Sequence, residues 1–161
     1  MSLGGRTLEN PFIAVIAGIL IAAGSAWITV KLSLSQFRSQ KLWEKKVEAY
    51  ERVIEALHHS KKFSNEYLKA EHKNTELPPE QDEALRSQSK AAHDEISKAA
   101  DVGALIFSDE AVAILSRFEV ETDSSPRFDS WYEYLNHDWL LINRYMSEFI
   151  DEAKRDIKDQ K

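Results

Sequence analysis

A run of apolar and small residues, Phe12–Val30, constrains the fold of this chain more than any other feature of its sequence. The run carries no charge, and its nineteen residues in helical form span about 28 Å, which matches the hydrocarbon layer of a bilayer. An amphipathic helix of a water-soluble domain has a polar stripe along one side, and this run has none. The sequence therefore predicts a tail over residues 1–11 and a transmembrane helix over residues 12–34.

A cleaved signal peptide is the alternative to a retained anchor, because Gly24–Ala26 offers small residues where a signal peptidase would cut. The only basic residue at the start of the chain is Arg6, and Glu9 offsets its charge. The apolar run is also longer than the usual core of a signal peptide. These observations favour a retained anchor.

Basic residues follow the apolar run and predict its orientation. Five cations stand against Glu44 alone between residues 31 and 46, whereas the N-terminal tail offers only Arg6. The positive-inside rule places the basic side in the cytoplasm, so we expect a bacterial inner-membrane protein whose N-terminus faces outward. The residues expected at the membrane interface are Trp27, Lys31, Arg38 and Lys41.

The remainder of the chain is acidic. Residues 47–161 contain 15 Lys and Arg residues against 25 Asp and Glu residues, a net charge of −10. Binding to nucleic acid needs a cationic surface, so general nucleic-acid binding is not expected. The chain has no cysteine, which excludes disulfides and thiolate metal sites.

Four helices are predicted after the apolar run, over residues 36–73, 80–101, 109–121 and 128–158. Pro78 and Pro79 stand where the second of them starts, and Ser108 is placed as the N-cap of the third. No segment shows the period-two alternation of a β-strand. The expected fold class is therefore all-α, with one N-terminal transmembrane helix followed by a cytoplasmic four-helix bundle over residues 35–161.

An apolar seam runs along the first of these four helices, at alternating spacings of four and three residues. Its members are Trp43, Val47, Tyr50, Ile54 and Leu57, and the seam lapses at Lys61 and Ser64. Such a seam belongs either to the core-facing edge of a bundle helix or to a short self-associating coiled coil. Two heptads are short for a coiled coil, so the bundle is favoured.

Small and hydroxylated residues recur at helical spacing within and just after the apolar run. They are Ala14, Gly18, Ala22, Ser25, Thr29 and Ser33. Small residues let membrane helices approach closely, and hydroxyls bond to a neighbouring helix or face water. The stripe fits the interface or lumen of a homo-oligomer, and it fits equally well a generic anchor in which Ala and Gly are common.

No pattern in the chain identifies an enzyme. The five histidines form no His-x-x-x-His pair, and neither a metal nor a cofactor is expected. The pairs Arg52–His58 and Arg86–His93 match the loose Arg-then-His spacing of HEPN-type ribonucleases, in which histidine is the acid or base and arginine holds phosphate. Chance alone produces such spacings in a chain with eight arginines and five histidines.

The apolar start, the phrases KLWEKKVEAYERVIEAL and ADVGALIFSDEAVAIL, and a long aromatic last helix form a familiar layout. This layout resembles small single-pass bacterial membrane proteins associated with antiviral defence, and most of all the HEPN-like membrane accessory proteins of type VI-B CRISPR systems. The resemblance implies a cytoplasmic helical domain and assembly into a ring-like membrane pore. Only Arg52 with His58 corresponds to a HEPN-like pair, and Val53 stands where that family commonly has a polar residue.

The sequence leaves two main functions open, and neither is enzymatic. The first is an oligomeric inner-membrane effector of antiviral defence, which perturbs the membrane or forms a pore on a cytoplasmic signal. The second is a membrane-tethered helical adaptor, which binds a cytoplasmic protein or a signalling ligand without forming a pore. The expected partners are the lipid bilayer and further copies of the chain, and a membrane-bound ribonuclease acting through Arg52 and His58 is the least supported hypothesis.

Overall fold

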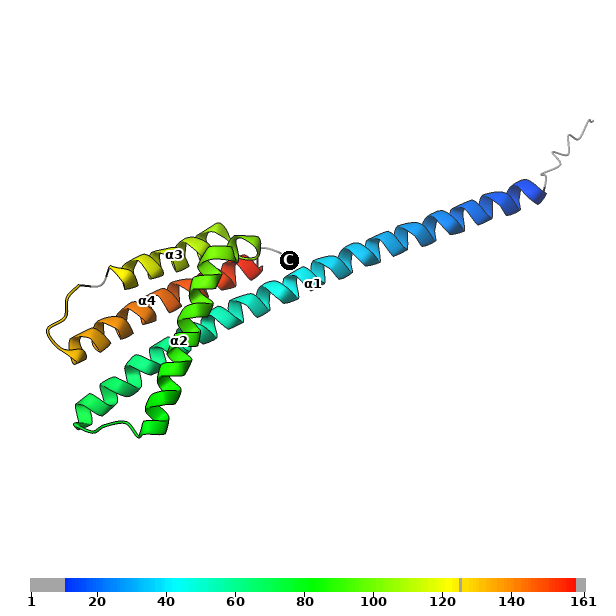
Figure 1. The fold of residues 1–161 in the computed structure, drawn as a ribbon. Coiled ribbons are helices and arrows are strands. Elements are labelled where there is room, and N and C mark those ends of the chain that lie inside the picture. Colours follow the sequence, from blue (N-terminus) through cyan, green and yellow to red (C-terminus); the bar gives the residue numbers. More distant parts are fainter. Residues whose placement is uncertain (1–10, 125, 159–161) are drawn as a thin grey trace, which may run out of the picture. The chain divides into compact units, whose positions relative to one another are not determined.

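The computed structural model describes residues 11–124 and 126–158, with side chains described from residue 31 onward. The described residues form four α-helices and one 3₁₀ turn, with no strand among them. The elements are α1 (Pro11–Lys73), α2 (Pro79–Val102), η1 (Gly103–Leu105), α3 (Asp109–Asp123) and α4 (Trp131–Lys158) (Figure 1). The prediction of an all-α helical bundle is confirmed.

The chain divides into two compact units, Met1–Leu42 and Trp43–Lys161. The predicted transmembrane segment lies in the first unit. Its backbone is helical from Pro11, but its side chains up to residue 30 lie outside the described residues. Within the described part of the chain, no helix is both long enough and apolar enough to cross a membrane.

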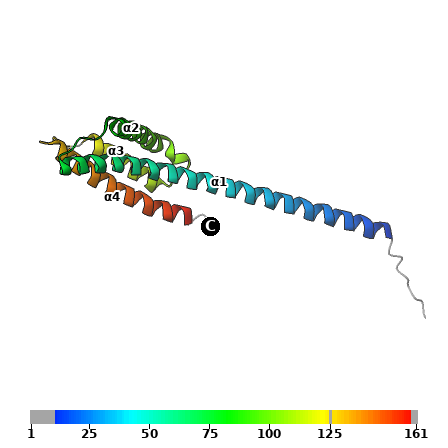
Figure 2. The same ribbon diagram turned by 90° about the horizontal axis from the view of Figure 1, so that it is seen from below.

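In the second unit, α4 runs antiparallel to the part of α1 that follows Leu42 (Figures 1 and 2). Lys46 Nζ donates to Asp156 Oδ1 at 2.8 Å, and Lys61 Nζ donates to Asn143 Oδ1 at 2.6 Å. The residue number therefore rises along α1 as it falls along the facing side of α4. Contacts between α2 and α3 and between α3 and α4 complete the bundle.

One main hydrophobic core holds the second unit together, and every helix contributes to it. Its largest fully buried apolar side chains are Tyr50, Val53, Leu57, Ile96, Leu115, Ile142 and Phe149. A smaller cluster of Tyr67, Leu85 and Leu135 closes the far end of the α1–α4 pair. The burial of apolar area in these clusters is what favours the bundle over separate helices.

The predicted seam on α1 only partly faces this core. Tyr50 and Leu57 are 1% and 0% exposed, whereas Trp43, Val47 and Ile54 are only half-buried. The buried face of α1 is centred instead on Ala49, Tyr50, Val53, Ala56 and Leu57. The helical bundle is confirmed, but only Tyr50 and Leu57 of the seam are buried in its core, and the apolar surface of α1 is wider than the core requires.

The lapse of the seam at Ser64 is not a break in the interface. Ser64 is fully buried, and its hydroxyl donates a short hydrogen bond to Asp138 Oδ2 on α4. Lys61 extends over the ring of Trp139, 5.4 Å from its centroid. The contact between α1 and α4 therefore continues past Leu57 through polar and cation–π pairs.

Local signals fix the helix ends. Asn74 has a φ of 54°, and the N–H groups of Asn74 and Thr75 donate to the carbonyls of Glu71 and Ala70 at 3.0 Å each. These two bonds form a Schellman motif, which needs a left-handed residue at the position of Asn74. The α1 helix therefore ends at Lys73, as the sequence predicts.

The start of α4 differs from the predicted start at residue 128. Ser130 Oγ accepts a hydrogen bond from the Glu133 N–H at 3.1 Å, and Glu133 Oε2 accepts one from the Asp129 N–H at 3.1 Å. This exchange resembles a capping box and sets Trp131 as the first helical residue. The Ser-x-x-Glu pattern that encodes it is present in the sequence.

Candidate functional site

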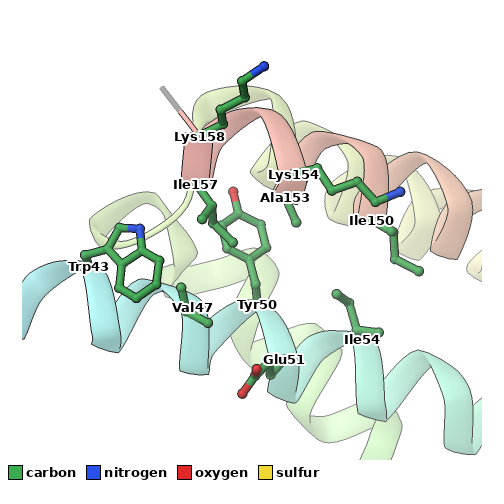
Figure 3. Close-up of a pocket in the computed structure, with 10 residues that line it drawn as sticks. All are labelled: Trp43, Val47, Tyr50, Glu51, Ile54, Ile150, Ala153, Lys154, Ile157 and Lys158. Atoms are coloured by element: carbon green, nitrogen blue, oxygen red, sulfur yellow. The ribbon is translucent and has the colours of Figure 1, made fainter. Parts of the chain in front are cut away.

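An apolar groove lies on the second unit between α1 and α4 (Figure 3). Its volume is about 420 Å³. The apolar groove is lined by Trp43, Val47, Tyr50 and Ile54 from α1 and by Ile150, Ala153 and Ile157 from α4, with Glu51, Lys154 and Lys158 at its edges. The seam residues of α1 that are only half-buried in the core therefore line this groove.

The side chains of the groove have a clear arrangement in Figure 3. Ile54 and Ile150 point toward one another from the two helices, and Tyr50 rises from α1 between them and Ile157. Glu51 points away from α4. The floor of the groove is therefore apolar, and charged groups stand only at its edges.

An unsatisfied donor stands at one end of the groove. The indole Nε1 of Trp43 is shielded from solvent and has no hydrogen-bond acceptor among the described residues. A buried polar group without a partner costs about 1–3 kcal/mol, so most native proteins avoid one. An acceptor supplied by a bound molecule removes this cost.

A polar network adjoins the groove through Tyr50. Tyr50 Oη donates to Asp156 Oδ2 at 2.6 Å, and Lys46 Nζ donates to Asp156 Oδ1 at 2.8 Å. The Ser108 N–H donates to Asp156 Oδ2 at 3.1 Å, and the Ser108 hydroxyl donates to Glu152 Oε1 at 2.7 Å. Asp156 thus accepts hydrogen bonds from α1 and from the start of α3 at once, which fixes the wall of the groove.

Burial and hydrogen bonding set the protonation states in this network. Burial, together with the hydrogen bond to Asp156, raises the pKa of Tyr50 above its ordinary value. Burial also opposes ionisation of Asp156, but the hydrogen bonds from Lys46 and Tyr50 outweigh it and hold the pKa of Asp156 below its ordinary value. At neutral pH the phenol of Tyr50 is therefore neutral and the carboxyl group of Asp156 is ionised.

Ser108 has the capping role that the sequence predicts. It precedes α3, and its Oγ accepts a hydrogen bond from the Ala111 N–H at 3.1 Å. The same hydroxyl donates to Glu152, which is 8% exposed and also pairs with Arg155 at 3.0 Å. The N-cap therefore links the start of α3 to the end of α4, which the sequence alone does not reveal.

The predicted oligomer stripe and membrane-interface residues belong to the first unit. The side chains of Ala14, Gly18, Ala22, Ser25, Trp27 and Thr29 lie outside the described residues. Ser33, Lys31, Arg38 and Lys41 are exposed, and Lys41 lies 5.9 Å from the centroid of the Phe37 ring. These residues stay predictions for a membrane interface.

The proposed HEPN-like pair occupies two separate faces of α1. Residues six positions apart differ by about 120° around a helix, and Arg52 and His58 are both exposed. Arg52 lies 3.7 Å from Glu95 of α2, while neither residue lines the apolar groove. No group of three or more metal-binding side chains occurs in the part of the chain that the structure describes.

Sequence reasoning missed the acidic half of the site. Glu152 and Asp156 read as solvated charges on an acidic helix, yet they are spaced at i and i+4 on the face of α4 that meets Ser108. Their only local signal is that spacing next to Ala153, on the apolar stripe.

Comparisons with protein-family models, with curated proteins and with solved structures found no match to this chain.

Proposed function

We propose that the protein is a membrane-tethered helical binding module, whose N-terminal apolar run is the anchor and whose second unit recruits a cytoplasmic protein. The observation that carries this proposal is the apolar groove, because the fold leaves aliphatic and indole side chains there only half-buried. Its volume falls within the range of about 300–1,000 Å³ that is usual for binding sites. No catalytic step is part of the proposal.

Support for the tether comes from the sequence of residues 12–34 and from the division of the chain. The second unit begins at Trp43 and has a core of its own, so its folding does not depend on burying the apolar run. The acidic charge of this unit argues against a nucleic-acid partner. A protein partner is therefore the occupant that the charge and the groove favour together.

An amphipathic helix is the shape that suits the apolar groove. Two antiparallel helices line it, and a third helix packs against such a pair by placing apolar residues at i, i+3, i+4 and i+7 into the space between them. Lys154 and Lys158 stand on the α4 edge, and Lys154 also pairs with Asp151 at 3.0 Å. Acidic residues on one flank of the partner helix would complement this edge.

Cysteine labelling tests the tether. The chain has no cysteine, so Ser2→Cys and Gln88→Cys each introduce a single reactive thiol. With a membrane-impermeant maleimide on intact bacterial cells, we expect labelling at position 2 and protection at position 88 until the cells are opened. Labelling at position 88 in intact cells would reverse the proposed orientation, and recovery of the protein outside the membrane fraction would refute the anchor.

Site-specific photo-crosslinking in cells tests the groove. We expect benzoylphenylalanine at Lys154 to give a discrete adduct, and the same group at Glu148, which faces about 120° away on α4, to give none. Ile150→Glu places a charge in the groove and should abolish the adduct. The proposal fails if positions 154 and 148 crosslink alike, or if the adduct contains only a second copy of the chain.

The small and hydroxylated stripe from Ala14 to Ser33 favours a second candidate, the oligomeric effector that perturbs the membrane. The role in antiviral defence that the resemblance implies belongs to this candidate. The native mass of the full-length protein in mild detergent separates the two. The effector is supported if the protein is a ring-sized oligomer and the double variant Gly18→Leu, Ala22→Leu dissociates it. A monomer or dimer supports the adaptor.

A further inference from the structure

A second cavity, different from the apolar groove, lies where all four helices converge. Its volume is about 370 Å³, and its lining is mixed in character. Ser60 and Phe63 come from α1, Phe118 and Thr122 from α3, and the rest from α2 and α4. We call it the polar cavity. Its α2 side carries basic side chains, and its α4 side carries a carboxyl group.

The α2 wall of the polar cavity is cationic. Arg86, Lys90 and His93 stand at i, i+4 and i+7, which places them within about 60° of one another around the helix. Arg86 Nε pairs with Asp82 at 2.9 Å. Lys90 and His93 have no ion pair with any described residue, so this wall offers the positive charge of Lys90 and N–H donors that the fold does not use.

The α4 wall presents a carboxyl group. Asp138 lines the polar cavity and receives a hydrogen bond from the buried Ser64 on one oxygen, Oδ2. No hydrogen bond to its other oxygen, Oδ1, occurs among the described residues. Burial raises the pKa of Asp138, although the hydrogen bond from Ser64 and the nearby His137 act against this rise. A donor on a bound molecule would satisfy Oδ1 and favour the ionised form.

Aromatic side chains also line the polar cavity. Phe63 and Tyr134 line the polar cavity together with Phe118 and the aliphatic Ile142. Flat apolar groups are suited to contact a heteroaromatic ring. The polar cavity therefore combines donors for an anion, aromatic side chains and an acceptor for ring N–H groups.

We propose that the polar cavity binds a small phosphate monoester whose far end is a ring with hydrogen-bond donors, and that a guanine nucleoside monophosphate is its model ligand. The phosphate contacts Lys90 and His93, with Arg86 beside them, because charge-assisted hydrogen bonds to phosphate are the strongest that these side chains form. The two neighbouring N–H donors of guanine face the carboxyl group of Asp138. The second unit thereby receives a small-molecule signal at a site separate from the apolar groove.

Isothermal titration of the full-length chain in mild detergent at low salt tests this inference, with GMP, guanosine and inorganic phosphate as probes. We expect GMP to bind at least tenfold more tightly than either fragment. Lys90→Gln should weaken GMP binding about tenfold, because it removes a charged phosphate contact. Lys98→Gln is the matched control, since Lys98 is exposed on the same helix and does not line the polar cavity.

The ring contact has its own variant. Asp138→Asn keeps an oxygen to accept the hydrogen bond from Ser64, so it preserves the fold while weakening the contact to the guanine donors. We expect it to reduce the preference for GMP over inorganic phosphate about tenfold, with circular dichroism unchanged. The inference is overturned if GMP fails to bind at millimolar concentration, if Lys90→Gln and Lys98→Gln behave alike, or if Asp138→Asn retains the full preference.

Discussion

The ammonium group of Lys46 lies 2.8 Å from Asp156 Oδ1, across 110 positions of sequence. The two side chains are only 9% and 13% exposed. An ion pair shielded to this degree resists screening by salt, and each partner prevents the other from becoming an unpaired buried charge. The pair therefore ties the start of the second unit to its last helical turns.

Asp156→Asn should lower the free energy of unfolding by about 3 kcal/mol, because it leaves the Lys46 ammonium without its counter-charge. Asp151→Asn is the matched control, since the pair of Asp151 with Lys154 is exposed and its loss should cost less than about 0.5 kcal/mol. Urea denaturation followed by circular dichroism measures both changes. Equal losses in the two variants would contradict the structural role of the buried pair.

The same pair has a defined dependence on pH. The pKa of Asp156 is lower in the folded chain than its ordinary value, so its contribution is complete above about pH 5 and is lost as the pH falls through the folded pKa. The difference in stability between the wild-type chain and Asp156→Asn should therefore shrink from pH 5 downward. A difference that stays constant over this range would exclude Asp156 as the titrating group.

Asp138→Asn should have the opposite effect and raise the melting temperature at pH 7. Burial raises the pKa of Asp138, so in the folded chain its ionisation costs stability at neutral pH. The advantage of the asparagine variant should disappear as the pH falls below the ordinary aspartate pKa of about 4. Asp138 is then protonated in both the folded and the unfolded wild-type chain. Thermal unfolding at pH 7 and at about pH 3 measures this, and a destabilised variant at pH 7 would refute it.

Gly103→Ala should destabilise the bundle by about 1–3 kcal/mol through overpacking. A Cβ at this position would lie 2.5 Å from Cδ2 of the Phe107 ring, whereas the φ of −64° suits any residue. Adding Phe107→Leu should recover part of the loss, which a double-mutant cycle detects. Strictly additive effects would show that the alanine side chain does not clash with the Phe107 ring. Ala104→Ser, at the exposed neighbouring position, serves as the control.

Replacement of Asn74 separates backbone strain from side-chain contact. Asn74→Gly should raise the free energy of unfolding by a few tenths of a kcal/mol, about the gain expected for glycine at a left-handed C′ position. Asn74→Ala should lower it by about 1 kcal/mol, because a residue with a Cβ at a φ of 54° is strained. Chemical denaturation ranks the three chains, and an alanine variant as stable as the glycine variant would contradict the Schellman geometry.

The sequence predicts the helices well because their signals are local. Proline at the start of α2, the Ser108 cap and the period of the apolar residues each lie within a few positions of the boundary that they set. The end of α1 at Lys73 is predicted, whereas the start of α4 is displaced by three residues, from 128 to Trp131, because the Ser130–Glu133 exchange decides it. Patterns of hydrophobicity do not register such a polar exchange.

The candidate sites are less predictable because their residues come from distant parts of the chain. Asp156 looks like a surface charge until Lys46, Tyr50 and Ser108 converge on it. From the sequence, the seam residue Ile54 is expected in the core. The orientation of α1 about its own axis instead places its neighbour Val53 in the buried position. A difference of one position around the helix decides between core and groove, and only tertiary packing settles it.

The antiparallel pairing of α1 with α4 also has a consequence for synthesis of the protein. The contacts of α2 with α3 and of α3 with α4 join neighbours in the chain, but the partner of α1 is α4, which leaves the ribosome after α2 and α3. Long-range closure of this kind is slow, because the intervening chain must first be brought together. Until Asp156 emerges, the apolar face of α1 around Tyr50 has no α4 to cover it. The nascent chain therefore passes through an interval in which the ribosome surface, a chaperone or a bilayer contacts that face before α4 does.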